Sequence, residues 1–123
     1  MSKKFDISNL IFVSLDDVRR VNLPAGTYLS SVAAHSALIV RKSGSAIYTF
    51  ENKSYESNSD TVLFIAKGSE YSLSIDQSGE CTVIEFDISP TQAEELFKNG
   101  AIYQYMTLGD KSIFKIVKNL RQF

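Results

Sequence analysis

The chain has 123 residues, of which 44% are hydrophobic and 22% are charged, an ordinary composition for one soluble globular domain. A formal net charge of −1 gives no reason to expect that the chain binds nucleic acid by itself. No apolar run approaches the roughly 20 residues that span a bilayer, so no membrane partner is expected.

The N-terminus and the cysteine content favour a cytoplasmic protein. Lys3 and Lys4 are not followed by the apolar segment that a secretory signal requires. The only cysteine, Cys81, excludes an internal disulfide. Because it lies in an apolar stretch, the sequence predicts a small buried residue there.

Short apolar segments separated by turns occupy most of the chain. Residues 10–13 are the first expected strand, and Pro24 and Gly26 supply a turn after the polar residues 16–20, which fit either an exposed strand or a helical turn. Further strands are expected at 27–32, 37–41, 46–50, from 55 onwards, 61–65, 71–75 and 81–86. About eight strands at intervals of roughly 8 to 12 residues indicate a β-sandwich or a small barrel.

Helical signals begin after residue 88. Ser89 can cap a helix, Pro90 suits its first position, and Gln92 completes a capping box. Asn99 and Gly100 are a good C-terminal stop. Residues 102–108 are ambiguous between strand and helix. The predicted organisation is a barrel over 1–88 and a helical extension over 89–123, both within one compact domain.

A second helix is expected from Asp110, its predicted cap. One face carries an apolar stripe that must be buried, either on the barrel or against a second copy of the chain. We expect this stripe to form a dimer or linker contact; it consists of Ile113, Phe114, Ile116, Val117 and Leu120. The cations at 111, 115, 118 and 121 are better explained as the solvated face than as a nucleic-acid site.

Two segments, 35–48 and 60–75, resemble the paired motifs of the cupin barrel through Gly44, Gly68 and their apolar spacing. In metal-binding cupins these motifs carry histidine and glutamate ligands. Here the corresponding positions of the first motif are Ser31, Ala33 and Ala37.

In the second motif, Ala66 stands in place of the usual proline and Tyr71 in place of the third histidine. A catalytic metal site needs three or more suitably placed ligands, and no nucleophile occupies a recognisable turn motif. The sequence therefore predicts no metal site, no cofactor, no catalytic residue and no enzyme activity.

Four residues are the candidates for contact with a small molecule: His35, Arg41, Tyr48 and Tyr71. The two tyrosines offer hydroxyl groups on apolar strand faces, as in many ligand pockets, and Arg41 could orient an anionic or hydroxylated ligand. Simpler interpretations stand beside these: aromatic core residues, a solvent-facing arginine near a turn, and a partly exposed histidine with one hydrogen bond.

The run through 38–40, Gly44, Tyr55, Asp60, 63–65, Gly68 and Tyr71 is similar to the barrel signature in the N-terminal domain of AraC-family transcription regulators. The resemblance covers nearly the whole chain, because the two expected helices stand where that family has its dimerising and linking helices.

The resemblance implies a mainly β fold, a cupin-like (jelly-roll) antiparallel barrel followed by two C-terminal helices. It also implies a domain that binds a small-molecule effector and forms a homodimer. Contact with DNA would come only through a helix-turn-helix portion that this chain lacks, as in an excised sensor domain. Two alternatives remain open: a small standalone cupin enzyme of the epimerase or dioxygenase type, and a ligand-free protein-interaction barrel.

Overall fold

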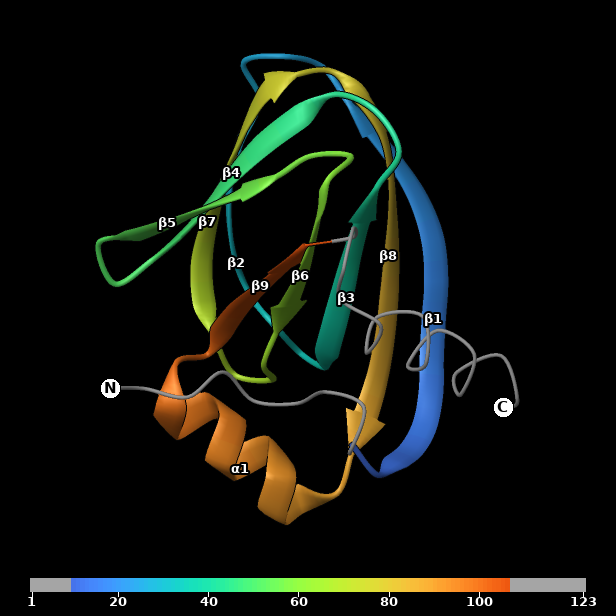
Figure 1. Ribbon diagram of the computed structural model, residues 1–123, viewed down its shortest axis with the longest axis vertical. Helices are drawn as coiled ribbons and strands as arrows, with labels where there is room; N and C mark the ends of the chain where they lie inside the picture. Colours follow the sequence, from blue (N-terminus) through green and yellow to red (C-terminus); the bar gives the residue numbers. More distant parts are fainter. Residues whose placement is uncertain (1–9, 107–123) are drawn as a thin grey trace.

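The computed structural model describes residues 10–106, which form nine strands and one helix (Figure 1). In chain order the elements are β1 (Phe12–Leu23), β2 (Tyr28–Val32), β3 (Ser36–Arg41), β4 (Ser45–Phe50), β5 (Lys53–Ser57), β6 (Thr61–Ile65), β7 (Glu70–Gln77), β8 (Gly79–Ile88), α1 (Pro90–Asn99) and β9 (Ile102–Met106). No helix among these residues is long and apolar enough to cross a membrane.

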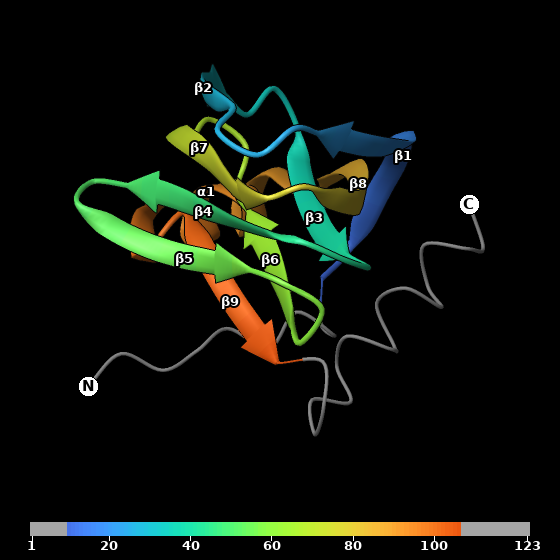
Figure 2. The same ribbon diagram turned by 90° about the horizontal axis from the view of Figure 1, so that it is seen from above.

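The strands form two antiparallel sheets that face each other (Figures 1 and 2). One sheet has the order β1-β8-β3-β6-β9 and the other β2-β7-β4-β5. The chain passes from one sheet to the other between β1 and β2, β2 and β3, and β3 and β4, which is the connectivity of a jelly roll. The prediction of a mainly β, cupin-like fold is confirmed.

The jelly-roll barrel that the sequence predicts is not closed, and its strands form an open sandwich. Within residues 10–106 no strand pairing joins one sheet to the other, so each sheet keeps two edge strands. At one edge, β1 pairs with β8 through two register irregularities, between Phe12 and Ser14 and between Leu15 and Asp17. Bulges of this kind bend a strand and increase its twist, and here β1 does not continue into a pairing with β2.

Side chains at alternate positions of the central strand β3 point into two different hydrophobic clusters. Leu38 and Val40 point to an outer cluster, whereas Ala37, Ile39 and Arg41 point between the sheets. The outer cluster consists of Leu10, Leu38, Val62, Phe64, Ala66, Phe86, Ile88, Leu96 and Tyr105. The inner cluster consists of Ala37, Ile39, Ala46, Tyr48, Leu63, Ile65, Ile75, Cys81 and Ile102. Every residue of β6 is buried, because both of its faces are covered.

Helix α1 lies at one end of the sandwich (Figure 1) and contributes Leu96 to the outer cluster. Its predicted start is confirmed: Ser89 is the N-cap, and its Oγ accepts a hydrogen bond from the Gln92 N–H at 3.4 Å. The Gln92 side chain does not complete a capping box. Its Oε1 accepts from the backbone N–H of Ile11 at 2.7 Å, which ties the helix to the segment before β1.

Part of the predicted helical extension is a strand. Residues 102–106 form β9, which pairs antiparallel with β6 and widens the five-stranded sheet. Only one of the two expected C-terminal helices is therefore described. The second, with Ile113, Phe114, Ile116, Val117 and Leu120, lies outside the described residues and stays a prediction.

Candidate functional site

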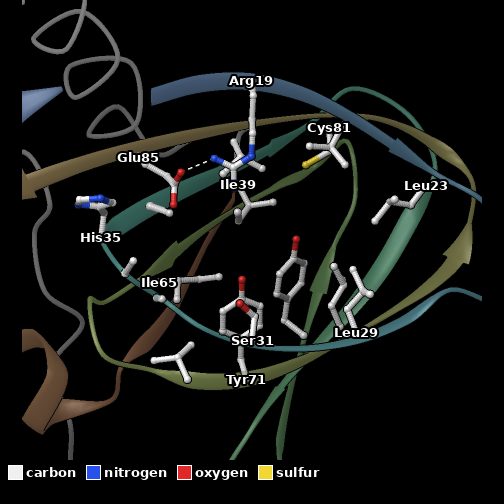
Figure 3. A pocket seen from close by; sticks show the side chains of 18 of the residues that line it. Arg19, Leu23, Leu29, Ser31, His35, Ile39, Ile65, Tyr71, Cys81 and Glu85 are labelled. Carbon is white, nitrogen blue, oxygen red and sulfur yellow. Dashed lines mark hydrogen bonds and ion pairs between the residues drawn. The ribbon is translucent and has the colours of Figure 1, made fainter. Parts of the chain in front are cut away.

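A cavity of about 510 Å³ lies between the two sheets. Its lining comes mainly from inward-facing residues at alternate positions of the strands, as Figure 3 shows for Ile39, Cys81 and Glu85. The lining is mostly apolar, with a few polar side chains among the aliphatic ones. This size and chemistry are typical of a site for a small organic molecule.

All four ligand-contact candidates line this cavity: His35, Arg41, Tyr48 and Tyr71. They come from different elements: Arg41 from β3, Tyr48 from β4, Tyr71 from β7, and His35 from the loop between β2 and β3. The fold thus brings together residues up to 36 positions apart in the sequence. Their role as ligand contacts remains a prediction.

Arg41 lies at the buried end of the cavity. The residue is only 5% exposed, so the alternative of a solvent-facing arginine is wrong. Its Nε donates to the Oγ of Ser57 at 3.1 Å, across to β5 of the opposite sheet. Tyr48 also lies close to Arg41, so the hydroxyl-bearing side chains beside the guanidinium carry no charge.

Tyr48 and Tyr71 form an aromatic pair on the four-stranded sheet, with ring centroids 5.7 Å apart and planes inclined by 33°. Tyr48 is 3% exposed, and burial raises the pKa of its phenol well above the ordinary value, although the nearby Arg41 offsets part of the increase. The Tyr48 hydroxyl therefore stays protonated and can both donate and accept a hydrogen bond.

His35 stands between two carboxylates near the exposed end of the cavity. Its Nδ1 lies 3.2 Å from Oδ2 of Asp16 and 3.3 Å from Oδ1 of Asp87. The Ser14 hydroxyl donates to the other oxygen of Asp16 at 3.1 Å. His35 is partly exposed with one hydrogen bond, to Asp87, as the simpler interpretation expects, and Asp16 is a second carboxylate beside the same nitrogen.

The donor atoms of Asp16, His35 and Asp87 all lie within 4.8 Å of one another, so the three residues could hold a divalent cation. None of them occupies a position that corresponds to a cupin metal ligand. Such a site would therefore differ from the metal centre of that family.

Sequence reasoning missed Arg19 and Glu85, which lie beside each other on the neighbouring strands β1 and β8 and line the cavity near His35 (Figure 3). Arg19 forms ion pairs with Glu85 and, at 2.9 Å, with Asp17. The hydrogen bond from Arg19 to Glu85 is the main reason why the pKa of the guanidinium is raised. Alternation along the expected strand 81–86 places Glu85 on the same face as Cys81, but the sequence alone does not show which face of the strand points inward.

Cys81 lies beside Arg41 in the register of β3 and β8 and is 3% exposed. The prediction of a buried residue is confirmed. Burial raises the pKa of its thiol, and the charges of Arg41 and Arg19 offset this only in part. Because the thiolate is the reactive form, this cysteine has the character of a packing residue rather than of a nucleophile.

Together, the jelly roll and its internal cavity define a cupin-like fold. No protein-family model and no curated protein sequence matches the chain. Among solved structures, ToxT from Vibrio cholerae, an AraC-family protein, aligns with a TM-score of 0.58 and 15% identity over 85% of this chain and 46% of ToxT. The chain therefore spans less than half the length of ToxT.

Two further structures share the fold. EutQ from Clostridium difficile aligns with a TM-score of 0.53 and 12% identity over 68% of this chain and 75% of EutQ. A cupin superfamily protein from Desulfitobacterium hafniense aligns with a TM-score of 0.52 and 12% identity over 71% of this chain and 83% of that protein. The resemblance that the sequence suggested, to the AraC-type cupin-like domain, is confirmed at the level of the fold.

Proposed function

We propose that this chain is the ligand-sensing domain of a transcription regulator of the AraC type. The observation that carries the proposal is the internal cavity of about 510 Å³, mostly apolar but with Arg41, Tyr48 and His35 in its lining. The shared fold with ToxT supports it, and ToxT has been solved with an unsaturated fatty acid bound. A comparable small molecule is the expected occupant here.

The regulatory mechanism is a coupling between the cavity and the assembly of the chain. A ligand shifts an equilibrium only if it binds one arrangement better than the other. We infer that the ligand shifts the equilibrium of a homodimer formed through the predicted helix with Phe114 and Val117. A helix-turn-helix portion elsewhere in the regulator would contact DNA, and the protein would act in the cytoplasm.

Thermal unfolding with a library of sugars, fatty acids and amino-acid derivatives tests the ligand-sensing function. A compound that binds only the folded chain stabilises it by about 2.7 kcal/mol at 100 times its Kd, which raises the Tm by several degrees. We expect at least one chemical class to do so. If no compound moves the Tm, the sensing function is contradicted, and the ligand-free interaction domain becomes the better account.

The dimer is tested separately by light scattering. Phe114→Glu and Val117→Glu should each halve the mass of the particle while the circular dichroism of the strands is retained. If both variants keep the mass of the wild type, the predicted helix is not the dimer contact.

The alternative of a small cupin enzyme is favoured by one observation, the convergence of Asp16, His35 and Asp87. Metal analysis of the purified chain distinguishes the two functions. Stoichiometric iron, manganese, nickel or zinc that is lost in His35→Ala would favour the enzyme. The sensor proposal predicts no stoichiometric metal.

A further inference from the structure

We propose that the cavity selects a ligand with an apolar body and one anionic group, a carboxylate, and that the carboxylate binds at Arg41 in the buried end. This inference rests on the proposed sensing function and specifies the chemistry of its ligand. It also gives the ligand a direction, with its charged group innermost and its apolar body towards His35 and the exposed end.

The position of Arg41 is the first argument. Arg41 follows Ala37 and Ile39 at alternate positions of β3, so the strand directs all three side chains between the sheets. Its neighbours at this end are nearly inaccessible: Ser57 is 0% exposed and Tyr48 3%. A charged group has thus been placed where the fold otherwise buries apolar and hydroxyl-bearing side chains.

The charge balance is the second argument. A buried cation is costly unless an opposite charge compensates it. Within residues 10–106 no carboxylate forms an ion pair with Arg41, whereas its chain neighbour Lys42 lies 3.8 Å from Glu80 and Arg19 pairs with Glu85. The Ser57 hydroxyl accepts a hydrogen bond from Arg41, and Tyr48 lies nearby, but neither of these neutral groups compensates the charge of the guanidinium. A ligand carboxylate would supply the missing charge.

The third argument concerns the end of the cavity near His35, whose charges indicate how the ligand is oriented. There, the inward carboxylate of Glu85 already neutralises Arg19, so an anion would gain little at this end and would meet the charge of Glu85. Between the ends, the cavity is lined by aliphatic side chains such as Ile39, Leu73 and Val83. An anionic group at Arg41 with an apolar chain along these residues matches each part of the cavity with its chemical complement.

The test compares three probes of equal chain length by calorimetric titration: decanoate, 1-decanol and decylammonium. For the wild type we expect decanoate to bind roughly 10- to 100-fold more tightly than decanol, the range of a hydrogen-bonded charge pair, and decylammonium to bind more weakly than both. Arg41→Met keeps the apolar stem and removes the charge, so it should lose the preference for decanoate and bind decanol as the wild type does. Arg41→Lys should retain part of the preference.

The outcomes separate the two proposals. Equal affinity of the wild type for decanoate and decanol, or an unchanged decanoate affinity in Arg41→Met, would overturn the carboxylate subsite and leave the sensing function intact. The same conclusion holds if none of the three probes binds while another library compound does. Because the probe comparison in the wild type needs no variant, the inference can be tested even if Arg41→Met does not fold.

Discussion

The two faces of the five-stranded sheet differ in how they are packed, although the same strands form both. On the outer face, aromatic rings pack against one another: Phe12 and Phe86 lie 5.1 Å apart between centroids, and Phe64 and Phe86 6.0 Å. On the inner face, the side chains border a cavity of about 510 Å³ and include the charged Arg41. We therefore expect the outer face to contribute more of the stability than the inner face, which borders a cavity instead of a filled core.

Leu38 and Ile39, adjacent on β3, offer the largest test of this difference. Both are almost fully buried, at 0% and 3% exposure, but Leu38 lies in the outer cluster and Ile39 borders the cavity. We expect Leu38→Ala to lower the free energy of unfolding by about 4 kcal/mol and Ile39→Ala by about 2 kcal/mol, both within the usual range of about 2 to 5 kcal/mol. Urea denaturation with unchanged m-values measures both. Equal losses would mean that the two faces are packed equally well.

Substitutions that enlarge a side chain should show the same difference between the two faces. Val62 is 1% exposed in the outer cluster, and Val83 lines the cavity. Val62→Phe overpacks a filled region and should cost about 2 to 3 kcal/mol. Val83→Phe has space to enter, so its free energy of unfolding should change by less than about 1 kcal/mol. A Val83→Phe variant as unstable as Val62→Phe would show that the inner region does not accept extra volume.

The smallest effect is expected at the exposed end of the cavity. Arg19, with 46% of its side chain exposed, pairs with Glu85 and Asp17. Exposed ion pairs contribute roughly 0 to 1 kcal/mol, so Arg19→Gln should leave the Tm within a few degrees of the wild type. A large loss of stability in a thermal melt would show that this pair is needed to hold the edge strand β1 against β8.

The sequence allowed good prediction of features that depend on local signals. The β3–β4 turn is one example: Gly44 adopts φ +76°, and a Cβ there would lie 2.5 Å from the Gln77 carbonyl oxygen, which fits a position where only glycine is comfortable. Asn52, in the turn between β4 and β5, has φ +66°, a conformation that asparagine adopts more readily than most residues. The cap of α1 by Ser89 follows from equally local chemistry.

Features that depend on distant partners could not be predicted in the same way. Residues 102–106 form β9 because they pair with β6, which would otherwise be an edge strand. The sequence of these five residues carries no signal of that distant partner. The register of β1 against β8 brings Arg19 to Glu85, and the pairing of both β1 and β3 with β8 brings Asp16 to His35, which directly precedes β3. A shift of one residue in a strand inverts every side chain, so neither pair could be derived from the local pattern.

Binding to a cavity variant tests the central claim most directly, that the space between the sheets is the ligand site. The library compound that raises the Tm most would be titrated calorimetrically into the wild type, Val83→Phe and Val18→Phe. Val18 is 55% exposed and does not line the cavity, so its variant is the matched control. The account predicts that Val18→Phe binds as the wild type does and that Val83→Phe, still folded, loses at least about ten-fold in affinity, or 1.4 kcal/mol. Unchanged affinity in folded Val83→Phe would contradict it.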